Sequence, residues 1–99
     1  MTDRDRVHSE LLSGISIFVQ VGQSDSLTAA ARKLNISASG VSRAVSRLEA
    51  RLGVRLVNRT TRSISLTAEG ETYFEQCKNF LNDLLNAEDR IRDGRSGAR

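Results

Sequence analysis

The fold of this 99-residue chain is decided by residues 26–53, which read SLTAAARKLNISASGVSRAVSRLEARLG. Apolar side chains recur every three or four positions over residues 27–34, which predicts a short amphipathic helix opened by Ser26 or Thr28. Asn35 tolerates the left-handed conformation that ends helices. The chain is therefore expected to turn sharply at this residue.

A second, longer helix is expected directly after the turn. Ser37 can cap it, and Gly53 can end it. Its apolar residues form one stripe, which leaves serines and three arginines spaced four residues apart toward solvent. A short helix, a tight turn and a second helix with a polar face make a helix-turn-helix, whose second helix enters the major groove of DNA. The stripe consists of Val41, Ala44, Val45, Leu48 and Leu52, and the arginines are Arg43, Arg47 and Arg51.

Positive charge is concentrated in the same part of the chain. Residues 32–62 hold eight of the fifteen basic residues and one acid, Glu49, which gives this segment a net charge of +7 within a chain of net charge +3. Such a segment suits a polyanion, because each phosphate neutralised by Arg or Lys releases condensed counterions. The alternatives for each arginine are a solvated surface or an ion pair with Glu49.

The segments on either side complete a small domain over residues 9–67. Residues 1–8 are charged and without periodicity, which predicts a flexible arm. Helical spacing of apolar residues predicts a helix over about 10–23. Beyond Gly53, alternation at Val54 and Leu56, and again at Ile64 and Leu66, predicts a two-stranded hairpin with the basic tip 58–63.

A long helix is predicted over residues 68–92, capped by Thr67 and followed by a flexible tail over 93–99. Its apolar residues are spaced alternately four and three apart, which indicates a seam for a partner helix. The alternative is that the stripe docks on the helix at 10–23. Cys77 is expected to be a buried apolar contact rather than a redox sensor. The residues expected in the seam are Tyr73, Cys77, Phe80, Leu81, Leu84 and Ile91.

Several classes of protein are not expected. No apolar run approaches the roughly 20 residues of a membrane span, and residues 1–10 lack the hydrophobic stretch of a signal peptide, so a cytoplasmic protein is expected. One cysteine and one histidine make neither a disulfide nor a zinc site. Without a nucleophile–base pair or a glycine-rich phosphate loop, we expect no enzyme, cofactor or metal.

The chain resembles one family over about residues 11–92, the LysR-type transcriptional regulators, in their N-terminal DNA-binding domain. The resemblance rests on a nearly continuous set of motifs. These are Phe18-Val19, Ser26-Leu27-Thr28-Ala29-Ala30-Ala31, Leu34, Ile36-Ser37, Val41-Ser42-Arg43, Leu48-Glu49, Leu52-Gly53-Val54-Arg55-Leu56, Arg59-Thr60 and Leu66-Thr67-Ala68-Glu69-Gly70.

The resemblance implies a mainly α fold, a winged helix-turn-helix followed by a long dimerisation helix. It implies sequence-specific binding to an interrupted palindrome in double-stranded DNA by a homodimer joined through residues 68–92. The family's effector-sensing C-terminal domain is expected to be missing here, and any small-molecule effector with it. Many members carry Gln-Pro-Ala where this chain has Ala38-Ser39-Gly40, so their base preferences cannot be transferred.

Candidate DNA-binding residues follow from the polar helix face and the hairpin. A hydroxyl at residue 28 suits either phosphate binding or capping, and Arg59 either meets phosphate or braces a strand. Arg62 is expected to enter the minor groove. The full set is Thr28, Ser37, Ser39, Gly40, Ser42, Arg43, Ser46, Arg47, Arg51, Arg59 and Arg62. The alternative function is a dimerisation module with an incidental basic face.

Overall fold

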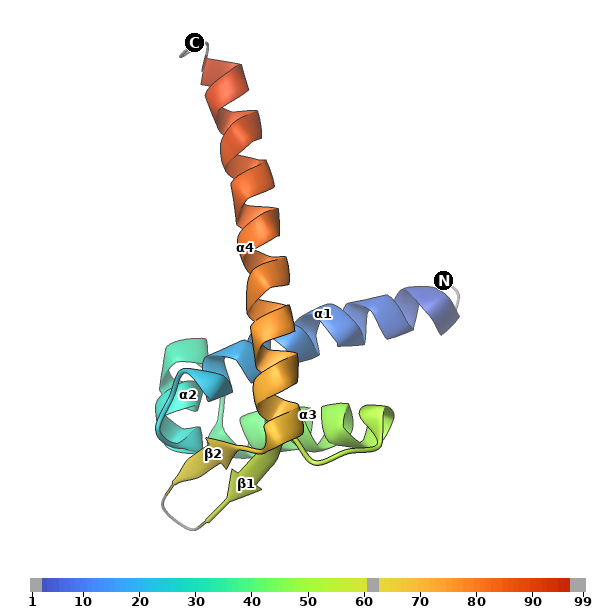
Figure 1. The fold of residues 1–99 in the computed structure, drawn as a ribbon, viewed down its shortest axis with the longest axis vertical. Coiled ribbons are helices and arrows are strands. Elements are labelled where there is room, and N and C mark those ends of the chain that lie inside the picture. Colours follow the sequence, from blue (N-terminus) through green and yellow to red (C-terminus); the bar gives the residue numbers. More distant parts are fainter. Residues whose placement is uncertain (1–2, 61–62, 97–99) are drawn as a thin grey trace.

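A computed structural model describes residues 3–60 and 63–96 of the chain. It is mainly helical, with one two-stranded antiparallel hairpin, which confirms the predicted fold class. The elements, drawn in Figure 1, are α1 (Asp3–Gly22), α2 (Leu27–Leu34), α3 (Ala38–Leu52), β1 (Val57–Arg59), β2 (Ile64–Leu66) and α4 (Ala68–Ser96).

The ends of α2 and α3 follow from local chemistry. The Ser26 hydroxyl accepts the N–H of Ala29, so this serine, and not Thr28, caps α2. Asn35 ends α2 in the left-handed conformation at φ 59°, and Gly53 ends α3 in the same way at φ 75°. The Ser37 hydroxyl caps α3. The predicted turn and both boundaries of α3 are thereby confirmed.

The hairpin begins later than the sequence predicted. β1 pairs with β2 in the register Val57–Leu66, Asn58–Ser65 and Arg59–Ile64, so the expected strand positions at residues 54 and 56 were wrong. Leu56 and Val57 are both buried, which strand alternation does not allow. The cause is Glu49 of α3, whose carboxylate accepts the backbone N–H groups of both residues and holds them against the helix.

Two helices are longer than predicted. α1 begins at Asp3, so the expected flexible arm is helical from there, because no Gly or Pro before Gly14 interrupts the segment. α4 continues to Ser96, past the expected end at residue 92, because a single Gly94 weakens a helix without ending it. The rest of the predicted arm and tail, residues 1–2 and 97–99, lies outside the described residues.

The core lies between α1, α2 and α3, and the start of α4 adds Cys77 to it. The remainder of α4 projects away from the body (Figure 1). The Phe18 ring lies 5.6 Å from the Tyr73 ring and 6.5 Å from the Phe74 ring, centroid to centroid. A Cβ on Gly22 would overlap the Phe74 ring, so this contact requires glycine. The buried residues are Ile15, Phe18, Val19, Val21, Ala30, Ala31, Val41, Val45, Leu48, Leu56, Val57 and Cys77.

Candidate nucleic-acid interface

The exposed face of α3 centres on Arg43. Val41, Val45 and Leu48 bury the opposite side of the helix. Arg43 lies two residues from both valines, which is about 200° of helix rotation away from them. Its side chain is exposed and forms no ion pair with a described residue. A free guanidinium therefore projects from the middle of the helix, away from the core.

Arg59 of β1 ties the hairpin to α3. Its Nη1 donates to the Ser42 hydroxyl at 2.8 Å, and its Nη2 donates to the Ser46 hydroxyl at 3.2 Å. Only a quarter of the Arg59 side chain is exposed. Of the two roles left open by the sequence, bracing is the one that this geometry supports.

Glu49 is the second part of this brace. Its side chain is only 12% exposed, and its Oε2 accepts the N–H groups of Leu56 at 2.8 Å and Val57 at 3.0 Å. Arg59 lies 3.6 Å from its Oε1, and the largely exposed Arg55 lies 4.0 Å from its Oε2. The single acid of the basic segment is thus occupied by the backbone and by hairpin arginines. The arginines of α3 have no such partner among the described residues.

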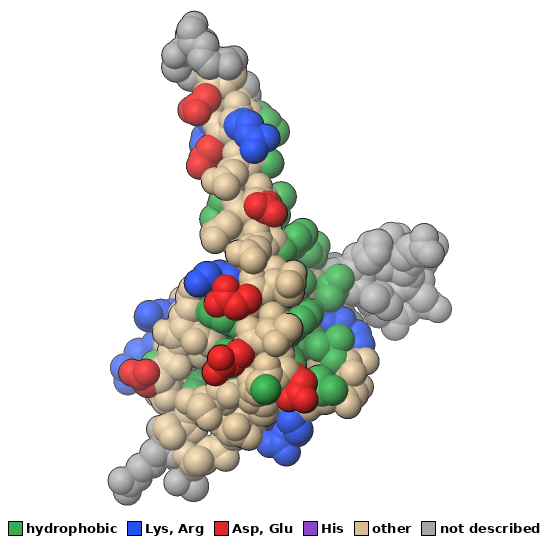
Figure 2. Space-filling model, in the orientation of Figure 1, with side chains coloured by type: hydrophobic (Ala, Val, Ile, Leu, Met, Phe, Trp, Pro, Cys, Tyr) green, Lys and Arg blue, Asp and Glu red, His purple; other side chains and the backbone are tan. Residues whose placement is uncertain are grey.

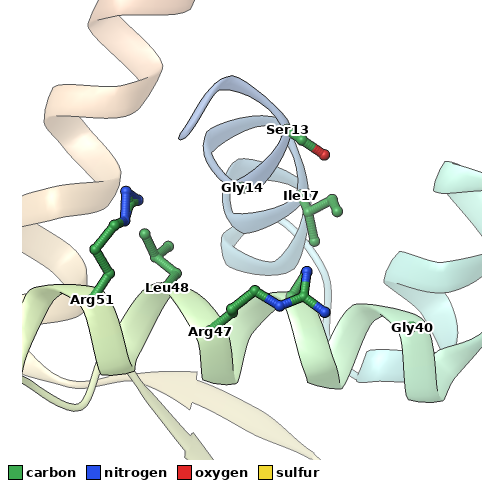
Figure 3. A pocket seen from close by; sticks show the side chains of 8 residues that line it. Ser13, Gly14, Ile17, Gly40, Arg47, Leu48 and Arg51 are labelled. Carbon is green, nitrogen blue, oxygen red and sulfur yellow. The ribbon is translucent and has the colours of Figure 1, made fainter. Parts of the chain in front are cut away.

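Arg47 and Arg51 turn from α3 toward α1, as Figure 3 shows. They border a groove of about 370 Å³ between the two helices, with Ile17 and Leu48 as apolar walls. The three arginines of α3 therefore wrap gradually around the helix, with Arg43 at the centre of the exposed face and Arg47 and Arg51 beside the groove.

The serines at the start of α3 are partly occupied within the chain. Ser37 accepts the Gly40 N–H at 3.0 Å, and its hydroxyl lies 3.3 Å from that of Ser39. Gly40 borders the groove beside α1, and a Cβ there would lie 3.1 Å from the Ser37 hydroxyl. Ser39 is exposed. The turn between α2 and α3 thus presents small, closely packed polar groups.

Two predicted residues do not belong to α3. Thr28 is exposed in the first turn of α2, where Ser26 already provides the cap. Its hydroxyl remains a candidate for phosphate. Arg62, predicted to enter the minor groove, lies outside the described residues.

The apolar stripe of α4 divides into two parts. Tyr73, Cys77 and Leu81 pack against the core of their own chain, as the docking alternative expected. Phe80, Leu84 and Ile91 remain exposed by 45%, 48% and 63%. Figure 2 shows apolar side chains along one flank of α4, while Lys and Arg gather mainly around the body below it.

Burial also governs the chemistry of Tyr73 and Cys77, in the part of the α4 stripe that packs against the core. It raises the pKa of the Cys77 thiol, although the hydrogen bond with Tyr73 opposes this shift. It likewise raises the pKa of Tyr73, with smaller contributions from Cys77 in the same direction. A buried thiol with a raised pKa is a poor nucleophile. Cys77 therefore serves as a packing residue.

Sequence reasoning missed the role of Glu49 as an acceptor for two backbone N–H groups. The available signal was that it is the only acid in a strongly basic segment. Over residues 3–60 and 63–96, no cluster of metal-ligating side chains is found. None of the helices in the part of the chain described is long and apolar enough to cross a membrane.

The fold and the exposed face of α3 define a winged helix-turn-helix protein. Residues 12–71 match the model of one family, described as bacterial regulatory helix-turn-helix proteins of the lysR family. This match covers more than half of the chain, and the chain belongs to that family.

Curated relatives agree with this family. The HTH-type transcriptional regulator CrgA of Neisseria meningitidis is 49% identical over 74 residues, which is 75% of this chain and 25% of that protein. The HTH-type transcriptional activator AaeR of Escherichia coli K12 is 42% identical over 82 residues, 83% of this chain and 26% of that protein. The chain thus spans about a quarter of the length of the curated relatives it matches.

Solved structures give the same result for the fold. A complex of the BenM DNA-binding domain with catB site 1 DNA matches with a TM-score of 0.80 at 30% identity, over 89% of this chain and 95% of that one. A complex of the CbnR DNA-binding domain with DNA matches with a TM-score of 0.74 at 33% identity, over 88% of this chain and 97% of that one. The fold is that of LysR-type DNA-binding domains.

Proposed function

We propose that this chain binds specific sequences in double-stranded DNA, with α3 in the major groove, as the DNA-binding domain of a bacterial transcription regulator. The observation that carries the proposal is the face of α3, where Arg43 projects without an acidic partner among residues 3–60 and 63–96, while Glu49, the acid of the basic segment, is occupied elsewhere. The solved complexes of the BenM and CbnR domains with DNA support it. In this role the protein works in the cytoplasm and catalyses no reaction.

The proposed DNA-binding form is a homodimer joined through α4. Phe80, Leu84, Leu85 and Ile91 expose apolar surface along a helix of 29 residues, and a second copy of the same helix can cover it. A dimer presents two copies of α3, which read two half-sites of an interrupted palindrome. Tyr73 and Cys77, already packed in one chain, contribute to this interface by holding α4 in place.

Titration of a fluorescent duplex at several salt concentrations tests DNA binding. About 4 to 6 phosphate contacts per subunit give a log–log slope steeper than about −4. Replacing Arg43 and Arg47 together by Ala should abolish site-specific binding. The matched control, Arg90→Ala with Arg92→Ala, removes the same charge from the far half of α4 and should leave binding intact. A flat salt dependence, or equal loss in both double variants, would refute the proposal.

The dimer is tested separately by sedimentation. Leu84→Glu places a charge in the proposed seam and should give monomers at concentrations where the wild type is dimeric. Asn86→Glu adds the same charge about 200° around the helix and should leave the dimer unchanged. If dimerisation survives Leu84→Glu while DNA binding is lost through Arg43 and Arg47, the seam lies elsewhere. If the double variant of Arg43 and Arg47 keeps its function, the alternative is preferred, in which the chain is a dimerisation module with an incidental basic face.

A further inference from the structure

We infer that each half-site is read through a guanine contacted by Arg43, because α3 offers DNA no free carboxylate and no side-chain amide. This inference rests on the proposed function, because it assumes that α3 lies in the major groove. Three features of the helix lead to it: its residue types, the occupation of its polar side chains and the position of Arg43.

The residue types of α3 exclude most acceptors. Residues 38–52 contain no Asn, Gln or Asp. Asn and Gln are the side chains that read adenine in bidentate fashion, with one donor and one acceptor. Glu49 is the only carboxylate of α3 that could accept from the N4 amino group of cytosine. Its carboxylate is 12% exposed and already accepts two backbone N–H groups, so it is not available to a base.

Arg59 sets the direction of the two serine hydroxyls beside it. A guanidinium only donates, so the oxygens of Ser42 and Ser46 must accept from it at 2.8 and 3.2 Å. Neither hydroxyl donates to another described residue. Each therefore keeps its O–H group, together with one lone pair of its oxygen, for a partner beyond the described residues. Because Arg59 already occupies one lone pair of each oxygen, both hydroxyls are available to donate to phosphate oxygens or to acceptor atoms of bases.

The position of Arg43 selects it as the base reader. It is exposed and lies about 200° around the helix from the buried Val41. Arg47 and Arg51 instead border the groove beside α1, which suits them to the backbone of the DNA. In the major groove, guanine alone presents two adjacent acceptors, N7 and O6, that match a guanidinium. On α3 the amino groups of adenine and cytosine find no free carboxylate or amide oxygen, only serine hydroxyls, which cannot pair with a base in bidentate fashion.

Selection of binding sites from random double-stranded DNA with the 99-residue protein gives the first readout. We expect one guanine per half-site, at positions related by the symmetry of the palindrome. Replacing that guanine by 7-deazaguanine removes the N7 acceptor and should weaken binding by at least about 5-fold. Inosine at the same position keeps N7 and O6, and should change the affinity by less than about 2-fold.

Two matched variants assign the contact to Arg43. Arg43→Gln supplies the side chain that pairs with adenine and should shift the preference at that one base pair from guanine to adenine. Arg51→Gln removes the same charge two turns along the helix. It should weaken binding to all sequences alike and keep the guanine preference.

The outcomes separate this inference from the proposed function. A selected site without a symmetric guanine, or one that tolerates 7-deazaguanine, overturns the guanine contact while DNA recognition stands. A guanine whose preference survives Arg43→Gln overturns the assignment to Arg43. No preference for any sequence refutes the proposed function and the inference together.

Discussion

Replacing Glu49 by Ala should destabilise the fold by removing the acceptor that joins α3 to the hairpin. The carboxylate accepts the N–H groups of Leu56 and Val57 at 2.8 and 3.0 Å, and both of these residues are almost completely buried. Arg59 also lies 3.6 Å from the carboxylate. The substitution therefore leaves two buried donors and one arginine without their shared partner.

The expected loss is about 2 to 4 kcal/mol. Each buried donor left without an acceptor costs about 1 to 3 kcal/mol. The 12% exposure of the Glu49 side chain allows water to replace part of what is removed, which keeps the total below the upper limit for two donors. A domain of this size has a free energy of unfolding of about 5 to 15 kcal/mol, so the loss is a large fraction of it.

Urea unfolding followed by circular dichroism, at one fixed protein concentration, measures this loss. Glu49→Gln is the control, because its amide oxygen can still accept both N–H groups while the charge is removed. It should cost about 1 kcal/mol. The reasoning is refuted if Glu49→Ala costs less than about 1 kcal/mol, or if the Gln variant is as unstable as the Ala variant.

Other variants test the packing of α4. A Cβ on Gly70 would overlap the carbonyl oxygen of Leu56 and lie 2.9 Å from its carbon, so Gly70→Ala should cost more than about 2 kcal/mol in urea unfolding. A Cβ on Gly14 would meet no atom within 4 Å, so Gly14→Ala should instead stabilise the protein by about 0.5 to 1 kcal/mol. If both glycine variants changed the free energy of unfolding equally, the close approach of Gly70 to Leu56 would be contradicted. Because burial raises the pKa of Cys77 and of Tyr73, the unfolded chain loses these protons first. The free energy of unfolding should therefore fall as pH rises above about 9, and less steeply in Cys77→Ala.

Features that depend on neighbours in the sequence were predictable. Ser37, Asn35 and Gly53 act within a few residues of their own positions, and the structure confirms the turn and the ends of α3. The apolar stripe of α3 could also be predicted, because its periodicity is local. The helix-turn-helix and the family could therefore be predicted from the sequence.

Features that depend on distant residues were not predictable in detail. Arg59 contacts hydroxyls 13 and 17 residues away in sequence, and no local pattern reports such a pairing. The stripe of α4 has one periodicity throughout, yet Cys77 is buried and Phe80 is exposed, because the body of the domain covers only part of the stripe. The start of α1 was missed because a charged segment can be either a solvated helix or an arm.

α4 is a long helix that is firmly attached to the body of the domain at its first turns. Its 29 residues span about 44 Å, and its first turns are held by close contacts that leave no room for a side chain at Gly70 or at Gly22 of α1. The hairpin is in turn tied to α3 through Arg59. A rotation of the far half of α4 should therefore carry α3 and Arg43 with it.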